Sequence, residues 1–191
     1  MATYKNFYSR QGLWTLFLMC ALPLHIWTII LAFRDFDWVT ARTNSWDAAG
    51  VVSYGVVFAL FESVVVFAVL ASIGLLASSK WDEKRRIALL SSLVVILSLW
   101  SMFNQAYFIN EWGVPAWLAS LVVATGRPLV ALYALAFGPV FITVALPAFF
   151  ILRSEKFYKG IQEGIERLSL LMLLYFFFDA AALINIIVRN L

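Results

Sequence analysis

Residues 51–77 read VVSYGVVFALFESVVVFAVLASIGLLA, and Glu62 is the only charged residue among them. A helix needs about 20 consecutive, mainly apolar residues to cross the hydrocarbon core of a bilayer. A soluble domain cannot hide a stretch of this length, because it needs polar residues spread along the chain to form its surface. The stretch therefore predicts a transmembrane helix.

The composition of the whole chain also indicates a membrane protein. Of its 191 residues, 63% are hydrophobic and 13% are charged, and the mean hydropathy is +0.89. Soluble domains have about 45–50% apolar and about 25% charged residues. The charged residues occur in short clusters between apolar stretches, which is typical of a protein that crosses the membrane several times.

Four further stretches have the length and apolarity of the first. The five predicted spans are residues 13–33, 51–77, 87–110, 128–153 and 167–189. The connections are too short for a soluble domain, so we expect an all-α polytopic integral membrane bundle that forms a single transmembrane domain over residues 1–191. Lys5 and Arg10 precede the first span, but it has full spanning length and no clear small-x-small cleavage site, so we expect an uncleaved helix rather than a signal peptide.

Lysine and arginine are distributed unevenly between the two predicted sides of the membrane. One side carries ten of them: Lys5, Arg10, Lys80, Lys84, Arg85, Arg86, Arg153, Lys156, Lys159 and Arg167. The other side carries four: Arg34, Arg42, Arg127 and Arg189. The more basic side of short loops is normally cytoplasmic. We therefore expect a multi-pass protein of the cell membrane, whether an inner or a plasma membrane, with its amino terminus in the cytoplasm and its carboxyl terminus outside.

The predicted connections differ in character. Residues 34–50 mix charged and aromatic side chains, and we expect a loop that folds back over the bundle or is simply capped. The basic segments 80–86 and 153–167 are expected to be solvated anchors. Residues 115–125 begin with Pro115 and are followed by Gly126, which predicts a short outer helix. It is too short to span, so it lies flat in the interface or dips in as a re-entrant helix.

Polar side chains inside the predicted spans are the candidate functional residues. An ionised side chain in hydrocarbon costs roughly 2.5 kcal/mol or more, so it is seldom kept without a role. The candidates for ligand or proton binding are His25, Glu62, Asn104, Gln105, Arg127, Tyr175 and Asp179. At about 1.5 Å per residue, Glu62 and Asp179 lie about 16 Å and about 15 Å from the outer ends of their spans. These depths place the two acids at one level.

Helical spacing gives these residues a direction. Glu62 shares a face with Gly55 and Ala59, and Gly55, Ala59 and Ser63 form a series of small residues that permits close helix contact. Tyr175 precedes Asp179 by four residues, so its phenol is expected to donate to the acid. We expect a polar cavity open to the outside, with the two acids at its floor. The alternative is that each acid pairs with His25 or Arg127 and holds helices together.

Several classes of chemistry are excluded by what the chain lacks. Cys20 is the only cysteine and His25 the only histidine, so the chain offers no internal disulfide, no haem held between two of its own histidines and no His-rich metal centre. The net charge of +3 is too small and too dispersed to indicate nucleic-acid binding. No nucleotide-binding, hydrolase or zinc motif is present. We predict no cofactor and no metal, and we assign no catalytic residue.

Three functions remain open from the sequence. The first is a membrane protein that binds a small ligand or a lipid headgroup in the outer polar cavity, or serves as a membrane subunit of a larger assembly. The second is a proton- or ion-coupled transporter that uses Glu62 and Asp179. The third is a membrane enzyme that acts on lipid-linked substrates through the same carboxyl groups. The expected partners are the lipid bilayer, a lipid headgroup or small ligand, and other membrane subunits.

Overall fold

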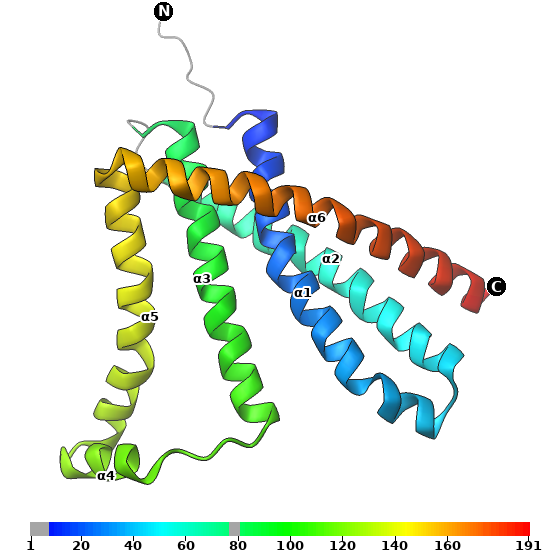
Figure 1. Ribbon diagram of the computed structural model, residues 1–191, viewed down its shortest axis with the longest axis horizontal. Coiled ribbons are helices and arrows are strands. Elements are labelled where there is room, and N and C mark those ends of the chain that lie inside the picture. The colour runs from blue at the N-terminus through cyan, green and yellow to red at the C-terminus, as the bar shows by residue number, and fades with distance from the viewer. Residues whose placement is uncertain (1–7, 77–80) are drawn as a thin grey trace, which may run out of the picture.

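The computed structural model describes residues 8–76 and 81–191, and these residues form helices and turns only. Lys5, Lys80 and the last residue of the predicted span 51–77 lie outside the described residues. The helices are α1 (Arg10–Arg42), α2 (Ser45–Leu76), α3 (Glu83–Ile109), α4 (Ala116–Ala124), α5 (Pro128–Arg153) and α6 (Glu155–Asn190) (Figure 1).

Every helix except α4 is long and apolar enough to cross a membrane, which makes five candidate spans. The predicted all-α architecture of five spans and one short helix is therefore confirmed. α5 coincides with the predicted span 128–153, and α4 lies within the predicted 115–125. The cytoplasmic position of the amino terminus stays a prediction.

The expected loop over residues 34–50 is wrong, because α1 continues to Arg42 and α2 begins at Ser45. No glycine or proline interrupts residues 34–42, so nothing stops the helix when the sequence becomes charged. The turn is set by local hydrogen bonds instead. The Asn44 side chain accepts from the Asp47 amide at 2.9 Å, which caps the start of α2.

The segment 153–167, which was expected to be a solvated anchor, is also mostly helical, because α5 ends at Arg153 and α6 begins at Glu155. The Ser154 hydroxyl accepts from the Phe157 amide at 3.3 Å, so it caps α6 at its first turn. Tyr158 and Ile165 are buried in the core, and Ile161 packs against it. Their spacing of three and four residues makes this charged segment an amphipathic helix. Average hydropathy did not reveal it because the opposite face is polar.

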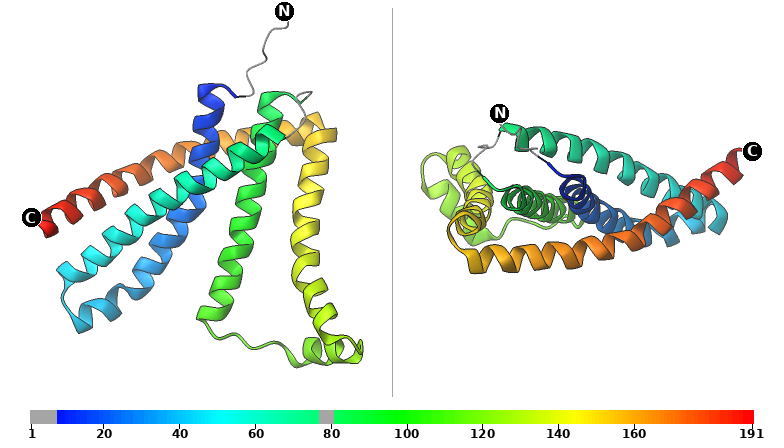
Figure 2. Two further views of the ribbon diagram at one scale, coloured as in Figure 1. Left: turned by 180° about the vertical axis from the view of Figure 1, so that it is seen from behind. Right: turned by 90° about the horizontal axis from the view of Figure 1, so that it is seen from above.

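The helices run alternately between two ends of the structure (Figures 1 and 2). One end, here named the basic end, collects residues 8–10, 81–86 and 153–159. The far end comprises the α1–α2 turn with the carboxyl terminus and, well separated from them, α4. α1 contacts α2, α3 and α6, and α6 crosses the other helices near the basic end. α3 and α5 diverge from α1 and α2 toward the far end.

The core lies around the first half of α1. Leu16, Met19 and Cys20 are at most 1% exposed, and they pack with residues of α3 and α6, including Val94 and Met172. In contrast, Ile151 is the only buried residue of α5, and α4 has no buried residue. Apolar side chains that face outward are the normal state of helices in lipid, because acyl chains solvate them.

A stripe of buried small residues allows α2 to approach its neighbours. Ala59 is 1% exposed, and Ser63 is fully buried with its hydroxyl donating to the Ala59 carbonyl at 2.6 Å. Gly55 is only half-buried, but a Cβ there would touch the Thr28 methyl group at 3.4 Å. The small-residue series therefore lies on the face of α2 that contacts the bundle.

Enlarging this stripe is expected to destabilise the fold. Ala59→Leu adds three carbons at a site with no free space, which should cost about 1–3 kcal/mol through overpacking. Ala68→Leu is the matched control, because Ala68 is exposed on the same helix. Thermal unfolding in detergent should show a lower Tm for Ala59→Leu and an unchanged Tm for Ala68→Leu. Equal Tm values for both variants would contradict the packing described here.

Candidate functional site

His25 on α1 and Asp179 on α6 form a hydrogen-bonded pair inside the bundle. His25 is 1% exposed and Asp179 is 3% exposed. His25 Nε2 lies 3.0 Å from Asp179 Oδ1, and His25 Nδ1 lies 2.9 Å from the Ala21 carbonyl oxygen one turn earlier in α1. Both ring nitrogens are therefore engaged, and the pair joins two spans at a point shielded from lipid.

The geometry determines where protons lie in this pair. A carbonyl oxygen can only accept, so His25 Nδ1 carries a hydrogen and donates it to Ala21. One proton between Nε2 and Oδ1 then completes the hydrogen bond, with either the imidazolium or the carboxylic acid as donor. In both forms the pair has no net charge, which lowers the cost of burying it. The pair can therefore hold one exchangeable proton.

Tyr175 lies beside the pair, but not in the predicted role. Its ring centroid is 6.1 Å from that of His25, with an interplanar angle of 43°. Among the described residues, its hydroxyl donates no hydrogen bond to Asp179. Asp179 Oδ2 is buried without a hydrogen-bond partner in the same part of the chain. Tyr175 therefore packs against the histidine, and the predicted phenol–carboxyl contact is not formed.

The other predicted site residues are distributed over the far half of the structure. The Gln105 side chain on α3 accepts from the Trp27 indole on α1. Asn104 is exposed, and so is Arg127, which is the N-cap of α5. Neither has a described side-chain hydrogen bond or ion pair to the His25–Asp179 pair. Gln105 thus links α3 to α1, while Asn104 and Arg127 are not gathered with the pair.

Glu62 is half-buried on α2. Within residues 8–76 and 81–191 it forms no hydrogen bond or ion pair, and the carboxyl group that it was expected to meet is bonded to His25 instead. Pairing with His25 is the alternative that the sequence left open for Asp179. A functional role for Glu62 stays a prediction.

A pocket of about 400 Å³ lies between α1, α2 and α6, about one helical turn from the pair toward the far end. Ile29 follows His25 by four residues, and Ala182 follows Asp179 by three. Its walls are mainly apolar and include Phe33, Val56 and Phe178. The cavity at this level is therefore apolar, where the sequence had led us to expect a polar one.

Ser53 and Asn185 are the two polar residues in the wall of this pocket. Asn185 Nδ2 donates to Ser53 Oγ at 2.7 Å and to the Ala49 carbonyl at 3.2 Å. Both bonds use the amide nitrogen, and no described residue donates to Asn185 Oδ1. Sequence reasoning selected amides on the third span, Asn104 and Gln105, but missed Ser53 on the second span and Asn185 on the last. The signal that could have identified Asn185 is a polar amide side chain within the last predicted span, after Asp179.

An ion pair closes the pocket region at the far end. Arg189 Nη2 lies 2.7 Å from Asp47 Oδ1, and the same guanidinium donates to the Trp46 carbonyl. Gly50 makes room for it, because a Cβ there would lie 2.6 Å from Arg189 Cζ. This contact, here named the far-end latch (Arg189, Asp47 and Trp46), holds the end of α6 against the start of α2.

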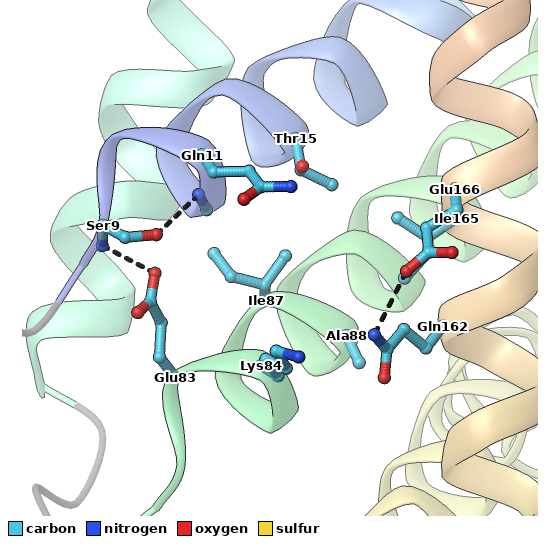
Figure 3. A pocket seen from close by; sticks show the side chains of 11 residues that line it. Ser9, Gln11, Thr15, Glu83, Lys84, Ile87, Ala88, Gln162, Ile165 and Glu166 are labelled. Carbon is cyan, nitrogen blue, oxygen red and sulfur yellow. Dashed lines mark hydrogen bonds between the residues drawn. The ribbon is translucent and has the colours of Figure 1, made fainter.

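A second, more polar pocket of about 200 Å³ lies at the basic end between α1, α3 and α6 (Figure 3). Glu83 Oε1 accepts from the Ser9 amide at 2.6 Å, and Gln162 donates to Glu166 Oε1 at 3.1 Å. The Ser9 hydroxyl caps α1 by accepting from the Gly12 amide at 3.0 Å. Both carboxylates accept hydrogen bonds from the protein itself. The bond between Glu83 and Ser9 holds the start of α1 against α3.

Tyr8 adds contacts to α2 and α3 at the basic end. Its hydroxyl donates to the Ala71 carbonyl at 3.1 Å, and the Arg86 guanidinium lies 5.7 Å from its ring centroid. Burial raises the pKa of the Tyr8 phenol, and the positive charge of Arg86 opposes this with a smaller effect. The phenol therefore remains a protonated donor at neutral pH.

Within residues 8–76 and 81–191, no three His, Cys, Asp or Glu side chains are grouped as a metal site would require. Comparisons with protein-family models, with curated proteins and with solved structures find no match to this chain. A proposal for its function therefore has to be argued from the chemistry of the two features described above, the buried pair and the apolar pocket next to it.

The buried pair should show strong energetic coupling. His25→Phe or Asp179→Leu alone leaves a buried polar partner behind, which should cost about 3–5 kcal/mol. The double variant replaces both groups by apolar ones and should recover most of that loss. Unfolding of the four proteins in detergent measures the coupling, and additive losses would contradict it. Glu62→Gln is the control, and we expect it to change stability little.

Proposed function

We propose that this multi-pass membrane protein binds a hydrophobic ligand with one hydrogen-bond donor in the pocket between α1, α2 and α6. The observation that carries the proposal is the chemistry of the pocket wall. It is apolar except at Ser53 and Asn185. Ligand sites in proteins commonly combine apolar walls with a few polar groups that orient the ligand. Asn185 Oδ1 is an acceptor without a described partner, so it fits a hydroxyl or amide hydrogen.

The position of the pocket supports entry of the ligand from the bilayer. Phe33 and Phe178 line the pocket and are 78% and 56% exposed. In a membrane these side chains face acyl chains, so a hydrophobic molecule reaches the pocket without crossing water. The proposal narrows the expected ligand from a headgroup to a lipid-like molecule with a small polar group. The cell membrane as location, and association with other membrane subunits, stay predictions.

A proton-coupled function is the second candidate, and the His25–Asp179 pair favours it. The pair holds one proton inside a membrane-crossing bundle, where ionisable groups often serve proton relays. In proteoliposomes with a pH gradient and an enclosed pH-sensitive dye, the wild-type protein should dissipate the gradient, and Asp179→Asn should not. Equal rates for both proteins would remove this candidate.

Filling the pocket is expected to block the ligand. Ala181 lines the pocket and is exposed, so Ala181→Phe places a ring in the ligand space without disturbing the core. The matched control is Ala180→Phe, because Ala180 is also exposed but does not line the pocket. In Ala181→Phe the ligand should lose about 2 kcal/mol of apolar contact with the pocket. This corresponds to a loss of more than about tenfold in affinity.

The probe is a long-chain alcohol that carries a photoreactive diazirine, added to the protein in nanodiscs. Mass spectrometry should find the label on peptides with Phe33 or Phe178 in wild type and in Ala180→Phe, and about tenfold less in Ala181→Phe. The same chain without its hydroxyl should label more weakly. Equal labelling of the two phenylalanine variants would overturn the proposal.

A further inference from the structure

A third cavity, a groove of about 250 Å³, lies near the basic end between α3, α5 and α6. It is separate from the pocket of the proposed function, because the two share no lining residue and lie toward opposite ends of the structure. Its walls include Val95 on α3, Pro147 on α5 and Phe157 on α6. Such walls suit an apolar chain.

Ser91 adds a polar group to this groove. Its side chain is fully buried, it lines the groove, and its hydroxyl has no hydrogen-bond partner in the described part of the chain. Ser53, Ser63 and Ser72 each donate to the carbonyl four residues earlier in their helix. Buried hydroxyls nearly always have a partner. The unused hydroxyl of Ser91 therefore points to an acceptor supplied by a bound molecule.

The wall formed by α6 is open at two glycines. Gly160 and Gly164 both line the groove, and no atom lies within 4 Å of where a Cβ would be at either position. Two glycines at this spacing often permit a second helix to approach. A helix with side chains is about 10–12 Å wide, so a groove of about 250 Å³ accommodates a single extended chain rather than a helix.

The charges around the groove are mostly positive. Glu155 pairs with Arg85, which neutralises both. Lys156 lies one turn before Gly160 on the same face of α6, and Lys159 follows in the next turn. Arg153, Lys156, Lys159 and Arg167 are exposed and form no ion pair within residues 81–191, against the acids Glu163 and Glu166 on the same stretch. Glu163 lies on the same face as Lys156, three residues after Gly160, but the four cations outnumber the two acids, so the α6 segment next to the groove carries a net positive charge that suits an anion.

We propose that this groove binds an anionic phospholipid from the leaflet at the basic end. One acyl chain lies against Val95 and the two glycines, an ester carbonyl accepts from the Ser91 hydroxyl, and the phosphate lies near Lys156 and Lys159. An anionic headgroup at the surface attracts nearby lysines, and basic pockets between transmembrane helices are suited to such lipids. The site is independent of the proposed function.

The test uses the full chain, purified in mild detergent and equilibrated with equal amounts of phosphatidylglycerol and phosphatidylcholine. Native mass spectrometry then counts the bound lipids. Wild type should retain phosphatidylglycerol in preference to phosphatidylcholine. Gly160→Leu/Gly164→Leu fills the groove and should abolish the preference. Gly138→Leu is the matched control, because a Cβ at Gly138 also meets no atom within 4 Å but lies outside this groove, and it should leave the preference intact.

Two further variants, one that changes surface lysines and one that removes a hydroxyl, make the test independent of any folding defect in the glycine variant. Lys156→Gln/Lys159→Gln should lose the preference for the anionic lipid, and Ser91→Ala should weaken retention about fivefold. Equal retention of the two lipids by wild type would overturn the proposal. An unchanged preference in the glycine or the lysine variant, or an equal loss in Gly138→Leu, would also overturn it. None of these outcomes bears on the proposed function, which is tested separately by labelling the pocket next to Asn185 with the long-chain alcohol.

Discussion

In hydrocarbon a backbone amide has no water to bond, so every amide must find a partner within the protein. This constraint explains why the described chain is helical almost throughout. At helix ends the first amides lack an acceptor within the helix, and side chains such as Ser154 and Asn44 supply one. Polar side chains inside a span can also find partners on a neighbouring helix. In α5 the Thr143 hydroxyl donates to the Pro139 carbonyl one turn earlier at 2.8 Å and accepts from the Trp100 indole on α3 at 2.9 Å, which links two spans.

Polar side chains obey the same constraint, and α6 shows it most clearly. Asp179 bonds to His25 on α1, Asn185 bonds to Ser53 on α2, and Arg189 pairs with Asp47 on α2. Each of these three polar groups therefore has its partner on another helix. Together these contacts determine how far α6 is shifted along the α1–α2 hairpin. They also place an apolar pocket between the three helices, because the remaining side chains at this level are aliphatic or aromatic.

Lipid replaces protein over much of the remaining surface. α5 buries only Ile151, and α3 and α5 diverge from the hairpin toward the far end. Helices that diverge leave grooves with apolar walls, and in a membrane such grooves are reached by lipid chains rather than by water. The proposed hydrophobic ligand and the proposed anionic phospholipid use two apolar grooves, one between α1, α2 and α6 and the other near the basic end between α3, α5 and α6. In each proposed site the directional contact is assigned to one neutral polar side chain, Asn185 or Ser91.

The amino-acid sequence alone determined the class, the five candidate spans and the short helix α4, because transfer of apolar residues into a bilayer depends on composition and length. It also identified His25 and Asp179, since buried ionisable groups are costly wherever they occur. It did not show that α1 and α6 extend beyond their apolar stretches, because a polar helix face lowers average hydropathy without breaking the helix. Only the tertiary structure decided that Asp179 meets His25 rather than Glu62. Depth along a span follows from counting residues, whereas the partner of a side chain depends on the rotation and crossing of helices, which are set by packing over the whole bundle.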